Sequence, residues 1–398
     1  MDRGPSSTTR PIDQAENLMT DFAARTGLTS NRTRPVRYLW TDAFAVCNFL
    51  ALARARKSEQ YVLLARSLVD QVHETLGRHR DDDSRSGWLS GLSEAEGARR
   101  PTAGGLRIGK KLPERSAYEP FDEQLEWERD GQYFHYLSKW MHALDLMARQ
   151  NREPHYAEWA RELAEVAGSA FIRRWGDTPH MVWKMSIDLA RPLVSSMGHH
   201  DPLDGYITLR QLQATAKAMK PNGTAHNRRE ASALNRLLEI FAEMIRDRNW
   251  QTADPLGLGG LLSDAARLMQ LIQKDDSADI ALLKDMLRDA RQGLDLWTQS
   301  GATARYAHSR LAFRELGLAI GIQGLRWMQK RAGADSELES RLNAMENFLP
   351  LAQTLTSFWT APASQQSPAW TQLQDINAVM LAAALMPQGF LMLPALNR

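Results

Sequence analysis

The sequence of 398 residues contains little cysteine, no long apolar run and no excess of either charge. Cys47 is its only cysteine, which excludes an intramolecular disulfide and a metal site built from several thiolates. Because Cys47 lies in the mainly apolar stretch 44–50, we expect a buried thiol that packs as a small apolar group.

These absences also bear on location and partners. The residues before Pro11 contain no apolar core of a secretory signal, and no window approaches the roughly 18–20 apolar residues of a membrane span. The 49 lysines and arginines are interspersed with 47 aspartates and glutamates, so the charge does not favour nucleic acid as a partner. We therefore expect a cytoplasmic protein with neither a membrane nor a nucleic acid as partner.

What the sequence does contain is helical periodicity along most of its length, with little alternating strand pattern. Two expected helices, 11–25 and 370–385, lack a partner next to them in sequence, and Pro11 suits the first turn of a helix. Pairing these two with each other gives twelve helices in six hairpins. The other expected hairpins are 39–56 with 59–79, 130–150 with 154–174, 204–219 with 227–248, 256–273 with 277–298, and 304–330 with 336–357.

Six hairpins can stack as an open solenoid or close into a ring. The first helix of several pairs, such as 39–56, is apolar nearly all round, which is typical of a helix buried on both sides. The hairpins also differ strongly in sequence and spacing, which counts against an open solenoid that binds proteins. We therefore predict an all-α fold, an (α/α)6 toroid that forms a single domain over 1–398, with 1–10 flexible.

One long insertion, 80–129, separates the first two hairpins and is rich in glycine, proline, serine and charge. Loops of this length in compact domains are commonly functional or disordered. This one holds too many apolar residues for a solvated linker: Trp88, Leu89, Leu106, Ile108, Tyr118, Phe121 and Trp127. We predict an ordered flap over one mouth of the ring.

The first helices of all hairpins run in the same direction, so their N-termini meet at one mouth of the predicted ring. Unpaired N–H groups and helix dipoles there favour polar or anionic ligands. Aromatic rings can stack on the C–H faces of a polyhydroxylated ligand while polar groups bind its hydroxyls. The residues predicted to bind such a ligand are Arg37, Tyr38, Trp40, Trp127, Gln132, Tyr133, Trp183, His199, Asp201, Arg305, Tyr306 and Trp370.

The hairpin count and the residues at the inner-helix starts, such as Trp40-Thr41-Asp42, resemble the (α/α)6-toroid carbohydrate-active enzymes. These include six-hairpin glycosidases, unsaturated-uronyl hydrolases and the N-acylglucosamine or cellobiose 2-epimerases. The resemblance spans the chain in hairpin number and contains no shared motif, so no catalytic residue is carried over. It implies a small-molecule or oligosaccharide substrate in the mouth.

Two chemistries fit this expectation. Hydrolysis requires a carboxylic acid and a carboxylate that flank a glycosidic bond, whereas epimerisation requires a base such as histidine beside a carbonyl group. Carboxylates, Asp201 among them, are more numerous at the predicted mouth, which favours a glycoside hydrolase over a sugar epimerase or isomerase. The candidate catalytic residues for the two reactions are Asp42, Glu128, Asp130, Asp204, His135, His200 and His308.

Structural and non-catalytic alternatives stay open. The aspartates at the helix starts, with Asp264 two turns inside one helix, can equally be caps or partners of the helix dipole. A non-catalytic scaffold that binds a protein would instead have a filled or sealed ring centre. The run 198–205 could bind a metal through His199 and His200, but adjacent histidines point apart on most backbones. We therefore predict no metal and no cofactor.

Overall fold

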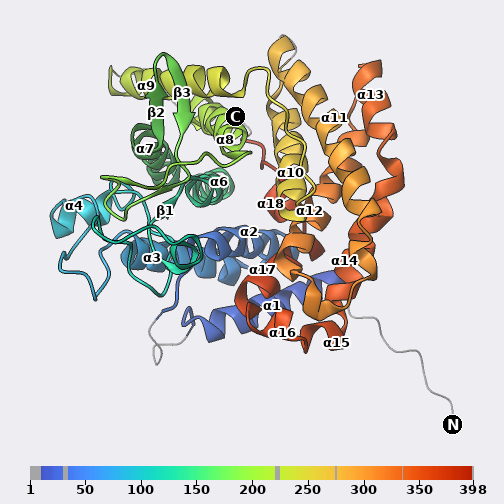
Figure 1. Cartoon of the computed structure of the whole chain (residues 1–398), viewed down its shortest axis with the longest axis horizontal. Coiled ribbons are helices and arrows are strands. Elements are labelled where there is room, and N and C mark those ends of the chain that lie inside the picture. Colours follow the sequence, from blue (N-terminus) through green and yellow to red (C-terminus); the bar gives the residue numbers. More distant parts are fainter. Residues whose placement is uncertain (1–9, 30–34, 220–224, 274–275, 334, 397–398) are drawn as a thin grey trace.

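The computed structural model describes residues 10–29, 35–219, 225–273, 276–333 and 335–396, so nearly all of the stretch predicted to be flexible lies outside the described ranges. Six helices form an inner ring, in which each helix packs against the next and the last packs against the first. The fold is therefore the (α/α)6 toroid that the hairpin count predicted (Figure 1). The inner helices are α2 (Leu39–Arg56), α6 (Phe134–Asn151), α8 (Asp201–Met219), α10 (Pro255–Leu271), α12 (Ala312–Gln329) and α17 (Gln374–Leu385).

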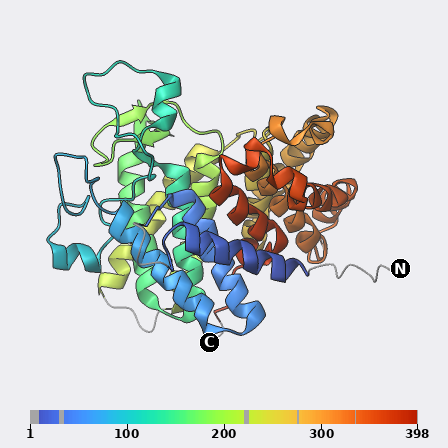
Figure 2. The same ribbon diagram turned by 90° about the horizontal axis from the view of Figure 1, so that it is seen from below.

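A second layer of helices covers the outside of the ring. α1 (Pro11–Arg25) lies on α17, where Arg25 Nε donates to Asp375 Oδ1 over 3.0 Å. Figures 1 and 2 both show this blue N-terminal helix beside the red C-terminal part of the chain, so the first and last helices form the predicted sixth hairpin. The other outer helices are α3 (Glu59–Leu76) on α2, α7 (Pro154–Phe171) on α6, α9 (Ala225–Ile245) on α8, α11 (Ser277–Gln299) on α10, and α13 (Ser336–Asn343) with α14 (Leu349–Thr360) on α12.

The inner helices have almost no solvent-facing side. In α2 every side chain from Leu39 to Ala53 is buried, Cys47 included, which confirms that an apolar surface all round marks the inner layer. The buried amide of Asn48 donates from Nδ2 to the carbonyl of Val379 on α17 over 2.9 Å, whereas its Oδ1 has no hydrogen-bond partner in the part of the chain that the structure describes. Among the described residues, no helix combines the length and the apolarity that crossing a membrane requires.

The helix expected over 130–150 starts late because its first residues form a strand. β1 (Gln132–Tyr133) pairs antiparallel with β4 (Lys184–Met185), and α6 begins only at Phe134. β4 also pairs with β5 (Pro192–Val194), which gives a three-stranded sheet in the order β1-β4-β5. The partner strands lie about fifty residues further along the chain, and local periodicity contains no information about such pairing.

The helix expected over 154–174 ends early for a similar reason. β2 (Ile172–Trp175) pairs antiparallel with β3 (Thr178–Met181), so α7 ends at Phe171. This two-stranded hairpin supplies the backbone hydrogen bonds that a longer helix would have supplied.

The last hairpins are interrupted where continuous helices were expected over 304–330, 336–357 and 370–385. α12 begins only at Ala312, because 3₁₀ turns replace its expected first part. Pro350 lies in the first turn of α14 and has no N–H to donate, so a helix continuing from α13 would lose a hydrogen bond there. The short elements are η1 (Ala302–Ala304), η2 (Ala307–Ser309), η3 (Glu346–Phe348), α15 (Pro362–Gln365) and α16 (Pro368–Thr371).

A further short helix, α18 (Gln388–Leu391), was not predicted and closes one end of the ring. The ring of Phe390 stacks on Phe44 of α2 with 4.2 Å between centroids, and its carbonyl oxygen lies 2.9 Å from His142 Nε2. Because α18 follows the C-terminus of an inner helix, it lies opposite the mouth, which is the end where the inner helices begin.

The insertion 80–129 is ordered and packs at two places. Trp159 Nε1 of α7 donates to the carbonyl of Arg99 over 2.9 Å, which holds the first half on the outer layer. The N–H of Ile108 donates to the carbonyl of Gly131 over 2.8 Å, which holds the second half beside the start of α6. The insertion contains α4 (Glu94–Arg99) and α5 (Glu123–Glu128). Its role as a flap over the mouth stays a prediction.

Substitution by alanine is expected to have opposite effects on stability at two neighbouring glycines of α10. A Cβ on Gly259 would lie 2.2 Å from the carbonyl oxygen of Gly317, because the backbones of α10 and α12 touch there. A Cβ on Gly260 would meet no atom within 4 Å. We expect Gly259→Ala to lower the free energy of unfolding by about 1–3 kcal/mol through overpacking. Gly260→Ala should raise it by about 0.5–1 kcal/mol through better helix propensity.

Urea denaturation followed by far-ultraviolet circular dichroism measures both changes, with each variant serving as the control for the other. A Gly259→Ala variant as stable as the wild type would contradict the close approach of α10 and α12.

Candidate functional site

Aromatic side chains from separate segments of the chain meet at the mouth, and we call them the mouth cluster. Its members are Tyr38, Trp40, Trp127, Tyr133, His135, Tyr136 and Trp183. Neighbouring ring centroids are 5.0 Å apart for Trp127 and Trp183, and 5.4 Å apart for Trp40 and Tyr136. All members except Tyr136 were predicted from the sequence as ligand-binding or catalytic residues. The closed ring and the sheet β1-β4-β5 bring them together.

Several polar atoms at this cluster are buried without a hydrogen-bond partner. Within the described part of the chain, Trp40 Nε1, His135 Nδ1, Trp183 Nε1 and Asp201 Oδ2 are buried and unpaired. His135 Nδ1 lies 3.7 Å from Asp201 Oδ2, which is longer than a hydrogen bond. Leaving a buried polar atom unpaired costs about 1–3 kcal/mol. The mouth therefore offers two indole donors, an imidazole and a carboxylate oxygen to a ligand.

A cavity of about 30 Å³ lies on the ring axis next to the mouth cluster, since Trp40 lines it. Inner helices α2, α6, α10, α12 and α17 contribute to its wall, and Phe390 of α18 contributes from the end opposite the mouth. This volume holds about one or two water molecules, whereas pockets for small organic ligands have roughly 300–1,000 Å³. The nearly filled centre is what the scaffold alternative predicts, but that alternative does not predict the unpaired atoms at the mouth.

Asp264 of α10 lines this cavity and belongs to an ion network between α6, α8 and α10. Arg267 Nη2 donates to Asp264 Oδ1 over 2.6 Å and to Asp204 Oδ1 over 2.8 Å, and Lys139 Nζ donates to Asp204 Oδ1 over 2.7 Å. Burial raises the pKa of Asp264, although Arg267 opposes this effect. For Asp204, burial is outweighed by Lys139 and Arg267, which hold its pKa well below its usual range. Asp264 is thus the carboxyl group of this pair that more readily carries a proton.

Asp42, a predicted catalytic residue, is held by protein groups. Its carboxylate accepts hydrogen bonds from Arg37 Nη1 over 3.2 Å and from the N–H of Tyr38 over 2.9 Å. Burial raises the pKa of Asp42 to about 6, against the effect of Arg37. These contacts fix the start of α2, and they also occupy Arg37, which was predicted to bind a ligand. Glu128, another predicted catalytic residue, is exposed on α5.

Asp130 and Gln132 hold the insertion in place. Asp130 is buried and accepts from Arg107 Nη1 and from the N–H of Gly109, each over 3.0 Å. Gln132 Oε1 accepts from the N–H of Leu106 over 2.8 Å. Both side chains therefore position the chain beside the mouth and are occupied by protein groups.

The histidine pair and Trp370 lie outside the mouth cluster. His200 Nε2 is 2.9 Å from the carbonyl oxygen of Trp250, and burial lowers the pKa of this imidazole. The His199 ring lies beside His200, with 4.6 Å between centroids. Trp370 is buried and stacks on Trp359 with 6.2 Å between centroids.

Arg305, Tyr306 and His308 lie on the segment of 3₁₀ turns before α12. Tyr306 is 79% exposed, and its ring stacks on His308 with 5.9 Å between centroids. Neither ring contacts the mouth cluster among the described residues, so their roles stay predictions. The described residues also contain no group of three or more His, Cys, Asp or Glu side chains suited to hold a metal ion.

Sequence analysis did not select Tyr136, Lys139 or Asp264 as site residues. Tyr136 Oη lies 2.7 Å from Tyr38 Oη, and Lys139 and Asp264 line the axial cavity. The helical period places His135 and Lys139 on one face of α6, which is a signal that was available. Asp264 lies two turns inside its helix, where sequence analysis interpreted it as a cap or dipole partner and not as a site residue.

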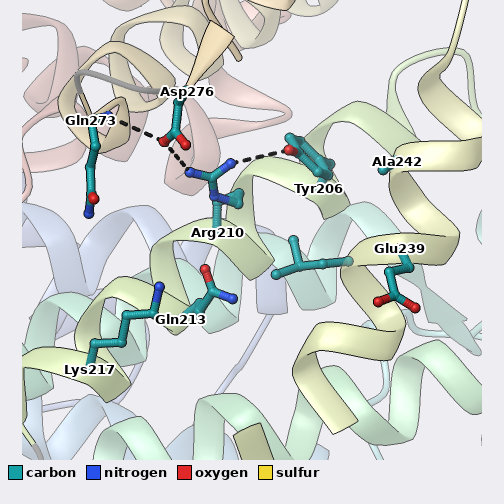
Figure 3. Close-up of a pocket in the computed structure, with 9 residues that line it drawn as sticks. Tyr206, Arg210, Gln213, Lys217, Glu239, Ala242, Gln273 and Asp276 are labelled. Carbon is teal, nitrogen blue, oxygen red and sulfur yellow. Dashed lines mark hydrogen bonds and ion pairs between the residues drawn. The ribbon is translucent and has the colours of Figure 1, made fainter. Parts of the chain in front are cut away.

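A larger hollow of about 380 Å³ lies away from the ring axis, between α8, α9 and the start of α11 (Figure 3). Its Arg210 donates to Tyr206 Oη over 3.2 Å and to Asp276 Oδ2 over 2.8 Å, and it also pairs with Asp279. No buried unpaired side-chain atom lines this hollow among the described residues. It has space for a ligand, but its central cation is already occupied, so the mouth is the better candidate site.

No protein-family model matches this sequence, and no curated protein is significantly similar to it. Solved structures nevertheless share its fold. One is a family 76 glycoside hydrolase, an α-mannanase from Bacteroides thetaiotaomicron, with 8% identity over 96% of this chain and 96% of that chain and a TM-score of 0.50. Another is a family 76 glycoside hydrolase from a bovine strain of that species, with 12% identity over 96% of this chain and 77% of that chain and a TM-score of 0.51.

A cellobiose 2-epimerase from Spirochaeta thermophila is 12% identical over 96% of this chain and 99% of that chain, with a TM-score of 0.48. The two family 76 structures, with TM-scores of 0.50 and 0.51, confirm the resemblance to (α/α)6-toroid enzymes at the level of the fold. At these identities the likeness establishes the fold alone, and chemistry has to be argued from the site.

Proposed function

We propose that this protein is a carbohydrate-active enzyme whose substrate binds at the mouth. The observation that supports this most is the mouth cluster with the unpaired buried atoms of Trp40, His135, Trp183 and Asp201. Aromatic faces stack on the C–H surfaces of sugars, and sugar hydroxyls can donate or accept the missing hydrogen bonds. The shared fold of a structure named as an α-mannanase adds support by analogy.

Among the carboxylates near the mouth, Asp201 and Asp264 fit glycoside hydrolysis best. Burial raises the pKa of Asp264, which favours the protonated form that a general acid needs. Asp201 Oδ2 makes no hydrogen bond, so it is free to act as the ionised base or nucleophile. Arg267 contacts Asp264 as well, but Asp264 lines the axial cavity. The other predicted carboxylates do not line this cavity, and they are Asp42, Asp130, Asp204 and the exposed Glu128.

Epimerisation or isomerisation is the second candidate, because His135 lies beside Asp201. A carboxylate near Nδ1 orients an imidazole and stabilises its protonated form, which is what a base next to a carbonyl group needs. The two reactions make different demands, since hydrolysis needs Asp264 and epimerisation needs His135.

Binding of a sugar requires the mouth cluster to move, because the axial cavity holds only about 30 Å³. Trp40 and Trp183 lie where a sugar ring would enter, so their environment must change on binding. A change in intrinsic tryptophan fluorescence on addition of ligand is therefore a direct measure of binding at this site.

Substitution of the proposed acid separates the two reactions. On α-linked manno-oligosaccharides we expect Asp264→Asn to lower kcat by roughly 10²–10⁴-fold through loss of general-acid catalysis. His135→Gln should retain most of the hydrolytic activity. Glu128→Gln alters an exposed carboxylate and is the matched control, with unchanged kcat expected. Chromatography of the products distinguishes shortened chains from isomers of equal mass.

Other outcomes decide against parts of the proposal. If the protein isomerises cellobiose, and this activity is lost in His135→Gln but kept in Asp264→Asn, then the proposed reaction is epimerisation and not hydrolysis. The proposal as a whole is wrong if the wild type neither converts these probes nor binds any sugar on a glycan array.

We propose further that residues 1–398 form one domain and that 80–129 is a flap over the mouth. We also place the protein in the cytoplasm and assign no metal or cofactor to the reaction, as the sequence predicts.

A further inference from the structure

Exposed aromatic rings continue outward from the mouth along the second half of the insertion. Tyr118 is 99% exposed, Phe121 is 56% exposed and Trp127 is 42% exposed. Gathered exposed apolar side chains commonly mark an interaction surface. Trp127 also belongs to the mouth cluster, since its ring packs edge-on against Trp183 with 5.0 Å between centroids. The three exposed rings lie close together in the sequence, and Trp127 connects this segment to the proposed site; we call Tyr118, Phe121 and Trp127 the row.

This row is held on an ordered part of the chain. The buried Lys184 Nζ donates to Glu126 Oε1 over 2.8 Å and to the carbonyl of Arg129 over 2.9 Å, which ties α5 to β4. Arg115 Nε donates to Glu126 Oε2 over 2.8 Å, and its guanidinium lies 5.7 Å from the centre of the Phe121 ring. Figure 2 shows this teal segment beside the green strands, on one side of the ring. Fixed anchors reduce the entropy that a ligand would otherwise have to remove on binding.

The surroundings of the rings fit a glycan better than an apolar partner. Arg129 pairs with Glu119 over 2.8 Å, and Arg115 pairs with Glu126, so charged groups alternate with the rings. A partner helix needs a continuous apolar stripe, which these ion pairs interrupt. A chain of sugars needs separate aromatic platforms with polar groups beside them. The row supplies the platforms, and Glu119, which pairs with Arg129, is a nearly half-exposed polar group next to Tyr118 in the sequence.

We propose that Trp127, Phe121 and Tyr118 are further sugar-binding subsites, so that the substrate is an oligosaccharide or polysaccharide chain and not a single sugar. This inference rests on the proposed function, because the chain must start in the mouth. The subsites bind sugar residues remote from the reacting bond. They contribute affinity that grows with the length of the chain.

The test is the affinity for mannose and for α-linked manno-oligosaccharides of two to six residues, measured by isothermal titration calorimetry. In the wild type we expect affinity to rise with length. Each of Trp127→Ala, Phe121→Ala and Tyr118→Ala should weaken binding of the longest chain by roughly 2- to 10-fold, which is the effect of one aromatic contact. Phe121→Ala and Tyr118→Ala should leave the affinity for the shortest ligands that bind almost unchanged.

Trp175→Ala is the matched control, because Trp175 is 85% exposed but lies on the separate hairpin β2-β3. Tyr118 and Phe121 are exposed, so their variants should fold even if Trp127→Ala disturbs the mouth cluster. Equal affinity at every length, or equal losses in the control and the row variants, overturns this inference and leaves the proposed function standing. No binding at any length, together with a blank glycan array, overturns both.

Discussion

Asp204→Asn is expected to lower the free energy of unfolding by about 3–5 kcal/mol, the cost of removing one partner from a buried ion network. Asp204 accepts from Lys139 Nζ and Arg267 Nη2, and it also accepts from Ser138 Oγ. Asparagine keeps the shape of the side chain but removes its negative charge. Asp264 is then the one carboxylate left in this network to balance the two buried cations, Lys139 and Arg267. Urea denaturation at neutral pH measures this decrease in the free energy of unfolding.

Asp285→Asn is the matched control, because Asp285 pairs with Arg288 while both side chains are nearly half exposed. Exposed pairs of this kind contribute about 0–1 kcal/mol. A loss below about 1 kcal/mol for Asp204→Asn, similar to that of the control, would contradict the role of the network.

The same substitution has a second, independent readout. The negative charge of Asp204 helps burial to raise the pKa of Asp264. Asp204→Asn should therefore lower the pKa of Asp264, because Arg267 then interacts mainly with that carboxylate. If Asp264 is the general acid, the alkaline limb of the pH–rate profile should move to lower pH in this variant.

Acidification from pH 6.5 to 5 is expected to destabilise the fold through two buried histidines. Burial lowers the pKa of His73 and of His142 to about 3. The unfolded chain takes up both protons below pH 6.5 while the folded chain does not, so the stabilisation is complete above pH 6.5 and is lost as the pH falls towards 3. The limiting slope is about 1.4 kcal/mol per group and pH unit, but the unfolded imidazoles are only half protonated at pH 6.5, so the two histidines together account for roughly 3 kcal/mol over this interval.

Protonation of Asp42 has the opposite effect on the free energy of unfolding over part of this pH range. Burial raises its pKa to about 6, so as the pH falls the folded chain binds this proton before the unfolded chain does, and the folded state gains roughly 1 kcal/mol between pH 6 and 5. Comparison of variants separates the two effects. His73→Gln keeps an acceptor for Trp140 Nε1, which donates to His73 Nε2 over 3.1 Å in the wild type.

Each of His73→Gln and His142→Gln should remove about half of the histidine contribution to the slope of stability against pH. The slope is measured from urea unfolding at several pH values. Variants that retain the full slope of the wild type would show that these histidines are not the groups that take up protons on unfolding.

The candidate site was found only in part from the sequence. Trp40, Tyr133 and His135 were selected because aromatic and ionisable residues stand at or near helix starts, and the structure brings them together. The same criterion selected Tyr306 and His308, which lie on exposed 3₁₀ turns. Composition at a helix start cannot tell whether that start faces the ring axis or the solvent.

The sequence by itself indicated six helical hairpins and favoured their closure into a ring, because periodic burial is a local property and an inner helix such as Leu39–Arg56 is buried on nearly every side. Only the tertiary structure decided which polar groups are already paired. Asp42 and Asp130 are occupied by arginines, while His135 Nδ1 and Asp201 Oδ2 stay unpaired. Pairing depends on contacts between residues far apart in the chain, and no local pattern of sequence records them.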